Sequence, residues 1–154
     1  GILYNTSEIN SEVQVEQVKE LAPNHDLEII VAGVRNTNEV SQALQSIIGK
    51  VDVLYTLTDN IIASAMPLIT SNATEKGIAV IGAEEAHVKS GALATEGINY
   101  YDLGFQTGTM AADVLEGKDI SEMPVATLEK MELVLNEEAA EKLGITFPED
   151  LKEK

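Results

Sequence analysis

The sequence contains no cysteine and no tryptophan, and it has only two histidines, His25 and His87. Without cysteine there are no disulfide bonds, thiolate metal sites or cysteine nucleophiles. Two histidines leave little material for a histidine-based metal site or a Ser-His-Asp triad, and we expect both to lie at the surface. The residues thus offer no convincing catalytic set, and we expect neither an enzyme nor a protein that needs a metal or cofactor.

Positive charge is also scarce, with 10 Lys and Arg against 26 Asp and Glu and a formal net charge of −16. Nucleic acids and anionic membrane surfaces attract basic patches, so neither is an expected partner. No apolar run reaches the ~18 residues that a transmembrane helix requires. The glycines form neither GxGxxG nor GxxxxGK[ST], so the sequence does not support dinucleotide or nucleoside triphosphate binding.

Strand-like and helix-like segments alternate along most of the 154 residues, a length that suits one hydrophobic core. The expected strands are 1–5, 27–32, 51–56, 78–82, 92–100 and 129–135. The expected helices are 11–22, 36–48, 59–75, 84–89, 102–115 and 137–143. This alternation predicts an α/β fold, with a doubly wound parallel sheet and helices on both of its faces.

Three polar residues stand where helices are expected to begin. Ser11, Asn36 and Asp59 each fit an N-cap, and capping alone would explain each of them. The run Thr58-Asp59-Asn60, however, has more polar side chains than one cap requires. We therefore keep two interpretations of Asp59 open, as a helix cap and as part of a binding site.

The polar turns at the strand ends are the candidate site, because ligands of open α/β sheets bind beyond the carboxyl ends of the strands. Glu8 and Asn10 follow the first expected strand, and Asp59 and Glu84 follow the third and fourth. Together they suit a small polar ligand with an ammonium and a carboxylate. Helix N-termini bind a carboxylate, and Asp59 or Glu8 pairs with an ammonium.

Short runs along the whole chain also form an ordered series. They are GILYN at 1–5, SEINS at 7–11, NTNEV at 36–40, KVD at 50–52, TDN at 58–60, GALAT at 91–95, YYDLG at 100–104, QTG at 106–108, MAA at 110–112, LEG at 115–117 and LGI at 143–145. In this order they resemble the C-terminal part of the ABC-transporter substrate-binding proteins of the tryptophan/tyrosine type.

The resemblance implies a type I periplasmic-binding fold, in which two α/β lobes close on a ligand. The chain begins inside an expected strand and without methionine, so we expect a piece of a longer protein. The resemblance also implies a C-terminal α/β lobe at 1–98 and a return segment at 99–122. The return segment is expected to pack on a missing N-terminal lobe or a partner chain. The tail at 123–154 is then expected to return to the lobe.

The function that the resemblance implies is the solute-binding component of an ABC importer. Such a protein delivers a small polar ligand, here an amino acid with aromatic ones included, to a membrane permease. It works outside the cytoplasm, in the periplasm or lipid-anchored on the outer face of the cytoplasmic membrane. By motif position, the residues that face the ligand are Asn5, Ser7, Glu8, Asn10, Ser11, Asp59, Asn60, Glu84 and Tyr100.

Two alternatives share this order of elements. A receiver-like signalling domain would place an acceptor aspartate where Asp59 stands, but it needs acidic residues after the first strand, where this chain has Asn5. The effector-binding core of a regulator would need a basic DNA-binding head, which a net charge of −16 disfavours.

The segment 92–117 carries many apolar residues that the resemblance assigns to an interface with the other lobe. We expect the run at 104–108, with a glycine at each end, to pack closely on a neighbouring element. In a chain that lacks the other lobe, this apolar surface is expected to drive a homodimer, in which two copies cover each other's apolar surfaces or exchange the helix at 102–115.

Overall fold

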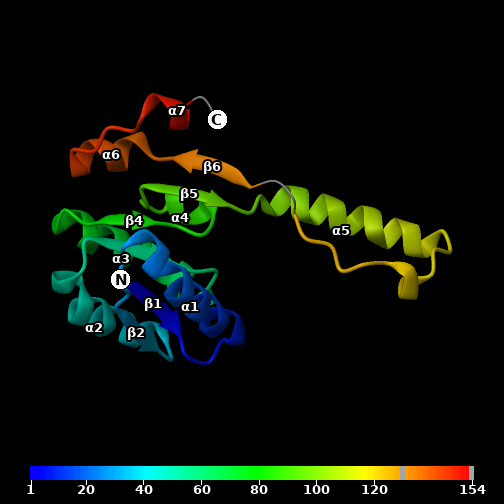
Figure 1. Cartoon of the computed structure of the whole chain (residues 1–154), viewed down its shortest axis with the longest axis horizontal. Helices are drawn as coiled ribbons and strands as arrows, with labels where there is room; N and C mark the ends of the chain where they lie inside the picture. The colour runs from blue at the N-terminus through cyan, green and yellow to red at the C-terminus, as the bar shows by residue number, and fades with distance from the viewer. Residues whose placement is uncertain (129–130, 153–154) are drawn as a thin grey trace.

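The computed structural model describes residues 1–128 and 131–152, which form an α/β body and a projecting arm (Figure 1). The body is built on a six-stranded sheet with the order β2-β1-β3-β4-β5-β6. The strands are β1 (Ile2–Asn5), β2 (Val31–Val34), β3 (Val53–Thr56), β4 (Ala79–Ile81), β5 (Ala94–Gly97) and β6 (Glu132–Leu135). The helices are α1 (Ile9–Leu21), α2 (Thr37–Ile47), α3 (Asn60–Glu75), α4 (Glu85–Lys89), α5 (Tyr100–Leu115), α6 (Glu137–Leu143) and α7 (Glu149–Lys152), with 3-10 turns η1 (Ala22–His25), η2 (Ile48–Lys50) and η3 (Ile120–Glu122).

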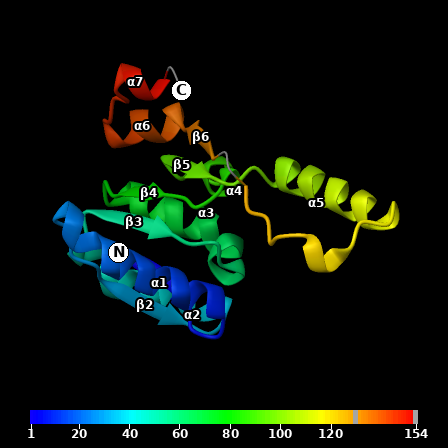
Figure 2. The same ribbon diagram turned by 45° about the vertical axis from the view of Figure 1, so that its right-hand side comes forward.

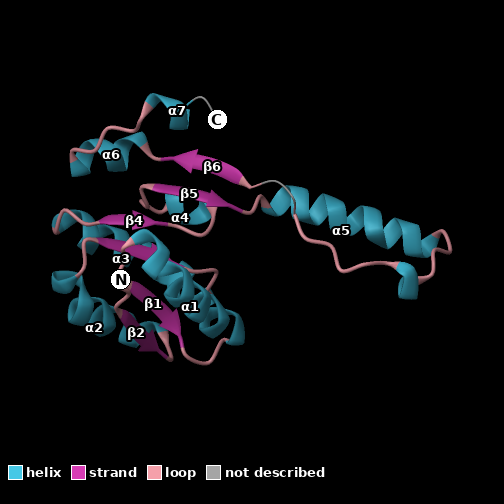
Figure 3. Cartoon of the chain, viewed as in Figure 1, coloured by secondary structure: helices cyan, strands magenta, loops and turns pink. Residues whose placement is uncertain are grey.

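Helices cover both faces of the sheet, as the sequence predicts (Figure 3). On one face, α2, α3 and α4 enclose the main core, in which Leu44 and Ile62 are fully buried against Leu3 of β1. On the other face, Val15 of α1 packs with residues of β1 and β3. α6 adds a smaller cluster against β4 and β5. The alternating apolar residues of each strand thus supply both cores.

The first five strands are parallel, as expected, but β6 runs antiparallel to β5, so the sheet is mixed. The pairing runs from Ala94 opposite Leu135 to Gly97 opposite Glu132. The expected tail strand started at 129, and residues 129–130 lie outside the described part of the chain. β6 is antiparallel because the chain leaves the body after β5 and returns to the same place, which reverses its direction.

The expected strand at 27–32 is wrong at its start, because β2 begins only at Val31. The preceding turn η1 ends at Asp26, whose φ of +54° places it in the left-handed region. Residues 27–30 then lead the chain back to the sheet, where the Ile30 carbonyl accepts a 2.9 Å hydrogen bond from Ile2 N. The apolar run is therefore partly an approach to the sheet edge.

The arm consists of α5 and the segment 116–128, which returns beside it (Figures 1 and 2). α5 starts two residues earlier than expected because the Asn99 side chain caps it, accepting hydrogen bonds from the N–H groups of Tyr101 and Asp102. No residue of α5 is buried. Apart from the helix itself, no described atom lies within 4 Å of where a Cβ would stand at Gly104 or Gly108. The close packing expected there is absent from the described chain.

Candidate ligand-binding site

The carboxyl ends of β1, β3 and β4 lie along one edge of the sheet, and α1, α3 and α4 begin there (Figure 3). All nine residues that the sequence predicts for the site lie on the turns or helix starts at this edge or at the start of the arm. Six of them belong to one hydrogen-bonded network after β1 and β3, and Asn10 bonds to the adjacent Thr58. The six are Asn5, Ser7, Glu8, Ser11, Asp59 and Asn60.

Asp59 organises this network from a nearly buried position, with 2% of its surface exposed. Its Oδ1 accepts hydrogen bonds from Ile61 N and Ile62 N, both at 3.0 Å, so it is the N-cap of α3 that the sequence predicts. Its Oδ2 accepts from Asn5 N at 2.6 Å and from Ser11 Oγ at 2.7 Å. These four donors occupy the roughly four acceptor sites of a carboxylate. The side chain therefore ties β1 and α1 to the start of α3.

Ser11 is not the N-cap of α1, which corrects the sequence prediction. The helix begins at Ile9, with Glu8 at the N-cap position, and Ser11 is a fully buried residue of its first turn. The early start follows from a tight turn after β1, in which Asn5 Oδ1 accepts a 3.0 Å hydrogen bond from Ser7 N and the Asn5 carbonyl accepts from Glu8 N. The Ser11 hydroxyl is thereby directed into the protein, toward Asp59.

Glu8 is the partly exposed carboxylate of the network. Its Oε1 accepts a 3.0 Å hydrogen bond from Asn5 Nδ2, and its Oε2 accepts a 3.4 Å bond from Asn60 Nδ2. Two amides thus hold the carboxylate in place, and each oxygen keeps an acceptor site. Glu8 makes no side-chain cap hydrogen bond to α1. Negative charge with unused acceptor sites is therefore available at the edge of the sheet.

Asn10 and Gln14 of α1 hold the turn after β3. Asn10 Nδ2 donates a 2.8 Å hydrogen bond to the Thr58 carbonyl. Gln14 binds the same residue twice, donating to Thr58 Oγ1 at 2.7 Å and accepting from Thr58 N at 3.3 Å. Gln14 is a residue of the candidate site that the sequence analysis missed. It stands three positions after Ser11, a spacing that is typical of a capping box and gives no sign of a contact with the turn after β3.

Glu84 and Tyr100 form a second group beside β4 and β5. Glu84 is the N-cap residue of α4, and its backbone pairs with Ile98 in an isolated parallel bridge, next to the start of the arm. Burial, and then the adjacent Glu84 carboxylate, raise the pKa of the Tyr100 hydroxyl. The structure thus brings these two predicted residues together. No hydrogen bond joins them to the first network among the described residues.

His87 lies beneath this second group and is 1% exposed, so the expected surface position is wrong. Its Nδ1 lies 3.0 Å from Thr56 Oγ1 and its Nε2 lies 3.2 Å from Glu84 Oε1. Burial lowers the pKa of His87, and the Glu84 carboxylate partly opposes this. Space for the side chain comes from Gly82, where an added Cβ would stand 2.6 Å from His87 Cβ.

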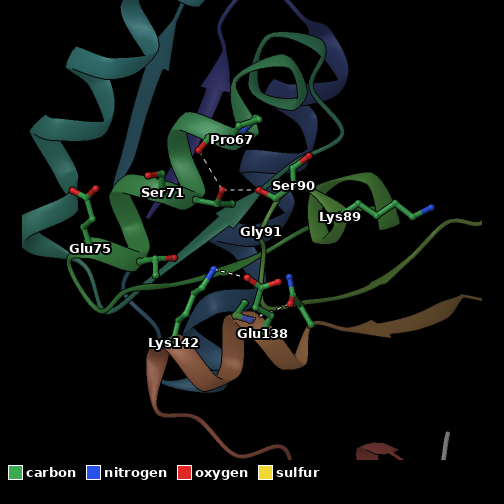
Figure 4. Close-up of a pocket in the computed structure, with 12 residues that line it drawn as sticks. Pro67, Ser71, Glu75, Lys89, Ser90, Gly91, Glu138 and Lys142 are labelled. Carbon is green, nitrogen blue, oxygen red and sulfur yellow. Dashed lines mark hydrogen bonds and ion pairs between the residues drawn. The ribbon is translucent and has the colours of Figure 1, made fainter.

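A groove of about 480 Å³ lies at the opposite end of the strands, between α3, the end of α4 and α6 (Figure 4). None of the nine predicted residues lines it. Its lysines are paired, Lys142 with Glu138 and Lys89 with Glu85, each at 2.7 Å.

No group of three or more potential metal ligands occurs within residues 1–128 and 131–152. No helix of these residues is long and apolar enough to cross a membrane.

Two solved structures share this architecture. A conserved domain protein from Vibrio cholerae O1 biovar El Tor superposes with a TM-score of 0.92 at 37% identity, covering 99% of this chain and 52% of that one. An ABC domain from Streptococcus pneumonia in complex with L-Trp superposes with a TM-score of 0.91 at 35% identity, with the same coverage of 99% and 52%. The chain thus spans about half the length of these proteins.

Sequence comparison agrees with the structural similarity. The chain is 44% identical over 145 residues to a tyrosine-binding protein of Clostridioides difficile, an alignment that covers 94% of this chain and 42% of the relative. A family model described as ABC transporter substrate binding protein matches residues 1–154. With the fold, the polar strand ends and a match along its whole length in agreement, the chain belongs to the family of ABC transporter substrate binding proteins.

Proposed function

We propose that the chain is one lobe of a protein that binds an aromatic amino acid outside the cytoplasm and delivers it, without chemical change, to an ABC permease. The observation that carries this proposal is the Glu8 carboxylate, which Asn5 and Asn60 hold at the carboxyl edge of the sheet with acceptor sites unused. A fixed carboxylate in a partly desolvated site is a strong partner for an ammonium group.

The two charged ends of an amino acid would meet different groups. The ammonium pairs with Glu8. The ligand carboxylate accepts from first-turn N–H groups of α1, since the Glu8 side chain makes no cap hydrogen bond to them. Asp59 has a different role from the ion pair that the sequence suggests: its four hydrogen bonds hold the turns that present Glu8 and Asn60.

The relatives support the ligand class. One is named a tyrosine-binding protein, and another was solved with L-Trp. On this chain, Tyr100 stands at the start of the arm beside Glu84 and is 56% exposed, which suits the wall of a cleft for an aromatic side chain. Family membership supports the permease as partner and an extracytoplasmic location.

We propose that the second wall of the cleft is another lobe, and that the divisions 1–98, 99–122 and 123–154 correspond to lobe, return segment and tail. The pairing of β6 with β5 and the packing of α6 on the body support the assignment of the tail. A ligand held by one wall alone stays half solvated, whereas small-ligand sites usually bury ~70–90% of the ligand. The arm is then the element that reaches the other lobe.

The test is calorimetric titration of the full-length protein with L-tyrosine and L-tryptophan. The wild type should bind both, and 3-(4-hydroxyphenyl)propanoate, which lacks the ammonium, should bind at least about tenfold more weakly. Glu8→Gln should weaken amino-acid binding by about tenfold or more. The matched control is Glu12→Gln on the exposed side of the same helix, which should bind like the wild type. Absence of amino-acid binding by the wild type would refute the proposal.

A further inference from the structure

We infer that Glu84, held in place by His87, selects ligands that carry a hydrogen-bond donor on the aromatic ring. The donor is the phenol O–H of tyrosine or the indole N–H of tryptophan, which phenylalanine lacks. This inference rests on the proposed function and adds the residue that distinguishes these ligands. Glu84 accepts the ring donor, and His87 is a positioning residue beneath it.

The position of Glu84 along the sheet edge supports this role. Glu8 follows β1 and Glu84 follows β4, and these strands are separated only by β3. Adjacent strands lie ~4.8 Å apart, so the two turns are about 10 Å apart along the edge. An aromatic amino acid with a hydrogen bond at each end has a comparable length. With the ammonium at Glu8, the far end of the ring points toward Glu84.

Glu84 is a nearly buried carboxylate on a fixed backbone. Its side chain is 13% exposed, and its backbone is extended and bridged to Ile98. The adjacent Tyr100 hydroxyl lies close enough to Glu84 for the carboxylate to raise the pKa of Tyr100. A nearly buried carboxylate needs further donors, because burying charge without hydrogen bonds is unfavourable. A phenol or indole group of the ligand supplies such a donor.

The hydrogen bonds of His87 determine which of its ring nitrogens faces Glu84. Ala83 N donates to Nδ1 at 3.4 Å, so Nδ1 acts as an acceptor. In the neutral ring the proton is then on Nε2, and this tautomer is assigned from the bonding pattern. Nε2, which carries this proton, lies 3.2 Å from Glu84 Oε1.

That N–H is not satisfied within the described residues. Although Nε2 is near Glu84, the contact lacks the alignment of a hydrogen bond, and Nε2 has no other hydrogen-bond partner in the described part of the chain. A buried donor without an acceptor is unfavourable, and a small rotation of the Glu84 carboxylate completes the bond. Thr56 contacts Nδ1 and the Gly82 backbone lies against the His87 Cβ, so both hold the imidazole in place. The Glu84 carboxylate is therefore the group that rotates.

The experiment measures dissociation constants of L-tyrosine, L-tryptophan and L-phenylalanine for the full-length protein and three variants. The wild type should bind phenylalanine at least about tenfold more weakly than tyrosine. Glu84→Ala should bring this ratio close to one. His87→Leu keeps an apolar side chain of similar size but no donor, and it should reduce the ratio as well. His87→Gln restores a donor at the position of Nε2, and it should recover much of the ratio.

The outcomes separate this inference from the proposed function. Equal binding of tyrosine and phenylalanine by the wild type, or an unchanged ratio in Glu84→Ala, would overturn the role of Glu84 while amino-acid binding stands. A ratio that falls equally in His87→Leu and His87→Gln would overturn the positioning role of His87. If His87→Leu does not fold, Glu84→Ala and His87→Gln still decide. Failure of the wild type to bind any of the three would refute the proposed function itself.

Discussion

The Ser11 hydroxyl donates a 2.7 Å hydrogen bond to Asp59 Oδ2, which joins α1 to the start of α3 across 48 positions of sequence. Both residues are buried, at 0% and 2% exposure. The backbone N–H of Asn5 binds the same oxygen at 2.6 Å. The turns after β1 and β3 therefore form one unit around a buried carboxylate, and this unit carries Glu8 and Asn60 at the carboxyl edge of the sheet.

The first prediction concerns stability. Asp59→Asn replaces one carboxylate oxygen with an NH2 group. That group is a donor facing protein donors, so at least one buried N–H or O–H loses its acceptor. We expect the free energy of unfolding to fall by about 3 kcal/mol, as measured by urea denaturation. Asp52→Asn, at an exposed position before β3, is the control and should change it by less than about 0.5 kcal/mol.

A different result would restore the role that the sequence suggests for Asp59. If Asp59→Asn left stability unchanged but weakened amino-acid binding about a hundredfold, the carboxylate would be a direct ligand contact rather than the support of the two turns.

The second prediction concerns pH. Burial lowers the pKa of His87 in the folded protein below its ordinary value of 6.5, the nearby Glu84 carboxylate partly opposes this, and Tyr100 lies on the Glu84 side of the group. Below that value the unfolded chain binds a proton that the folded chain does not. The contribution of His87 to the free energy of unfolding is therefore complete above pH 6.5. It is lost as the pH falls toward the pKa of His87 in the folded protein.

His87→Gln should consequently reduce the loss of stability between about pH 7 and pH 5, measured by urea denaturation at several pH values. His25→Gln is the matched control, because His25 is exposed and its substitution should leave the pH profile unchanged. Parallel profiles for the wild type and His87→Gln would show that His87 titrates normally.

The third prediction compares two glycines. At Gly97 an added Cβ would stand 2.4 Å from the backbone oxygen of Ala83, which precedes Glu84. Backbone cannot yield as a flexible side chain does, so Gly97→Ala should lower the free energy of unfolding by about 1–3 kcal/mol. Gly104→Ala in α5 meets no described atom within 4 Å outside its own helix and should raise it by about 0.5–1 kcal/mol. Thermal or chemical denaturation decides, and similar effects at both positions would contradict the structure.

The fourth prediction concerns the arm. Tyr101, Phe105 and Leu115 lie on one side of α5 and are 80%, 71% and 89% exposed. Burying such a surface contributes roughly 25 cal/mol per Å², so the 1–154 chain should self-associate, by a dimer in which copies cover or exchange their arms. Added salt screens the repulsion between acidic chains and should strengthen the association.

Light scattering at low and physiological salt measures this. Phe105→Asp should shift the chain toward monomer, whereas Thr107→Asp introduces the same charge elsewhere on α5 and should have little effect. A wild-type chain that is monomeric at every concentration and salt level would contradict the prediction.

Much of the fold is predictable because strand and helix patterns are local. The apolar spacing of Val40, Leu44 and Ile47 predicts α2, and all three are buried against the sheet. The caps Asn36 and Asp59 are also local signals, and both are confirmed. The direction of β6 is not predictable in this way, because it depends on the path of the arm rather than on the residues of the strand.

The place of the candidate site could be predicted from the sequence, whereas the contacts of its side chains could not. The rule that ligands bind at the carboxyl ends of strands locates Glu8 and Glu84. The same rule does not reveal that Ser11 faces inward, since its partner Asp59 lies 48 residues away. The burial of His87 depends on Gly82 and Thr56, whose packing appears only once β3 and β4 lie side by side.

The antiparallel pairing of β5 and β6 makes the whole arm an insertion in a hairpin. Gly97 and Glu132 face each other, so the ends of the segment 98–131 are held at neighbouring points of the sheet. The entropic free-energy cost of closing a loop grows only with the logarithm of its length, by ~0.6 kcal/mol for each doubling. A two-residue turn can thus replace the segment with the strand register kept. The arm can therefore vary in length or sequence while the pairing of β5 and β6 and the core of the body stay as they are.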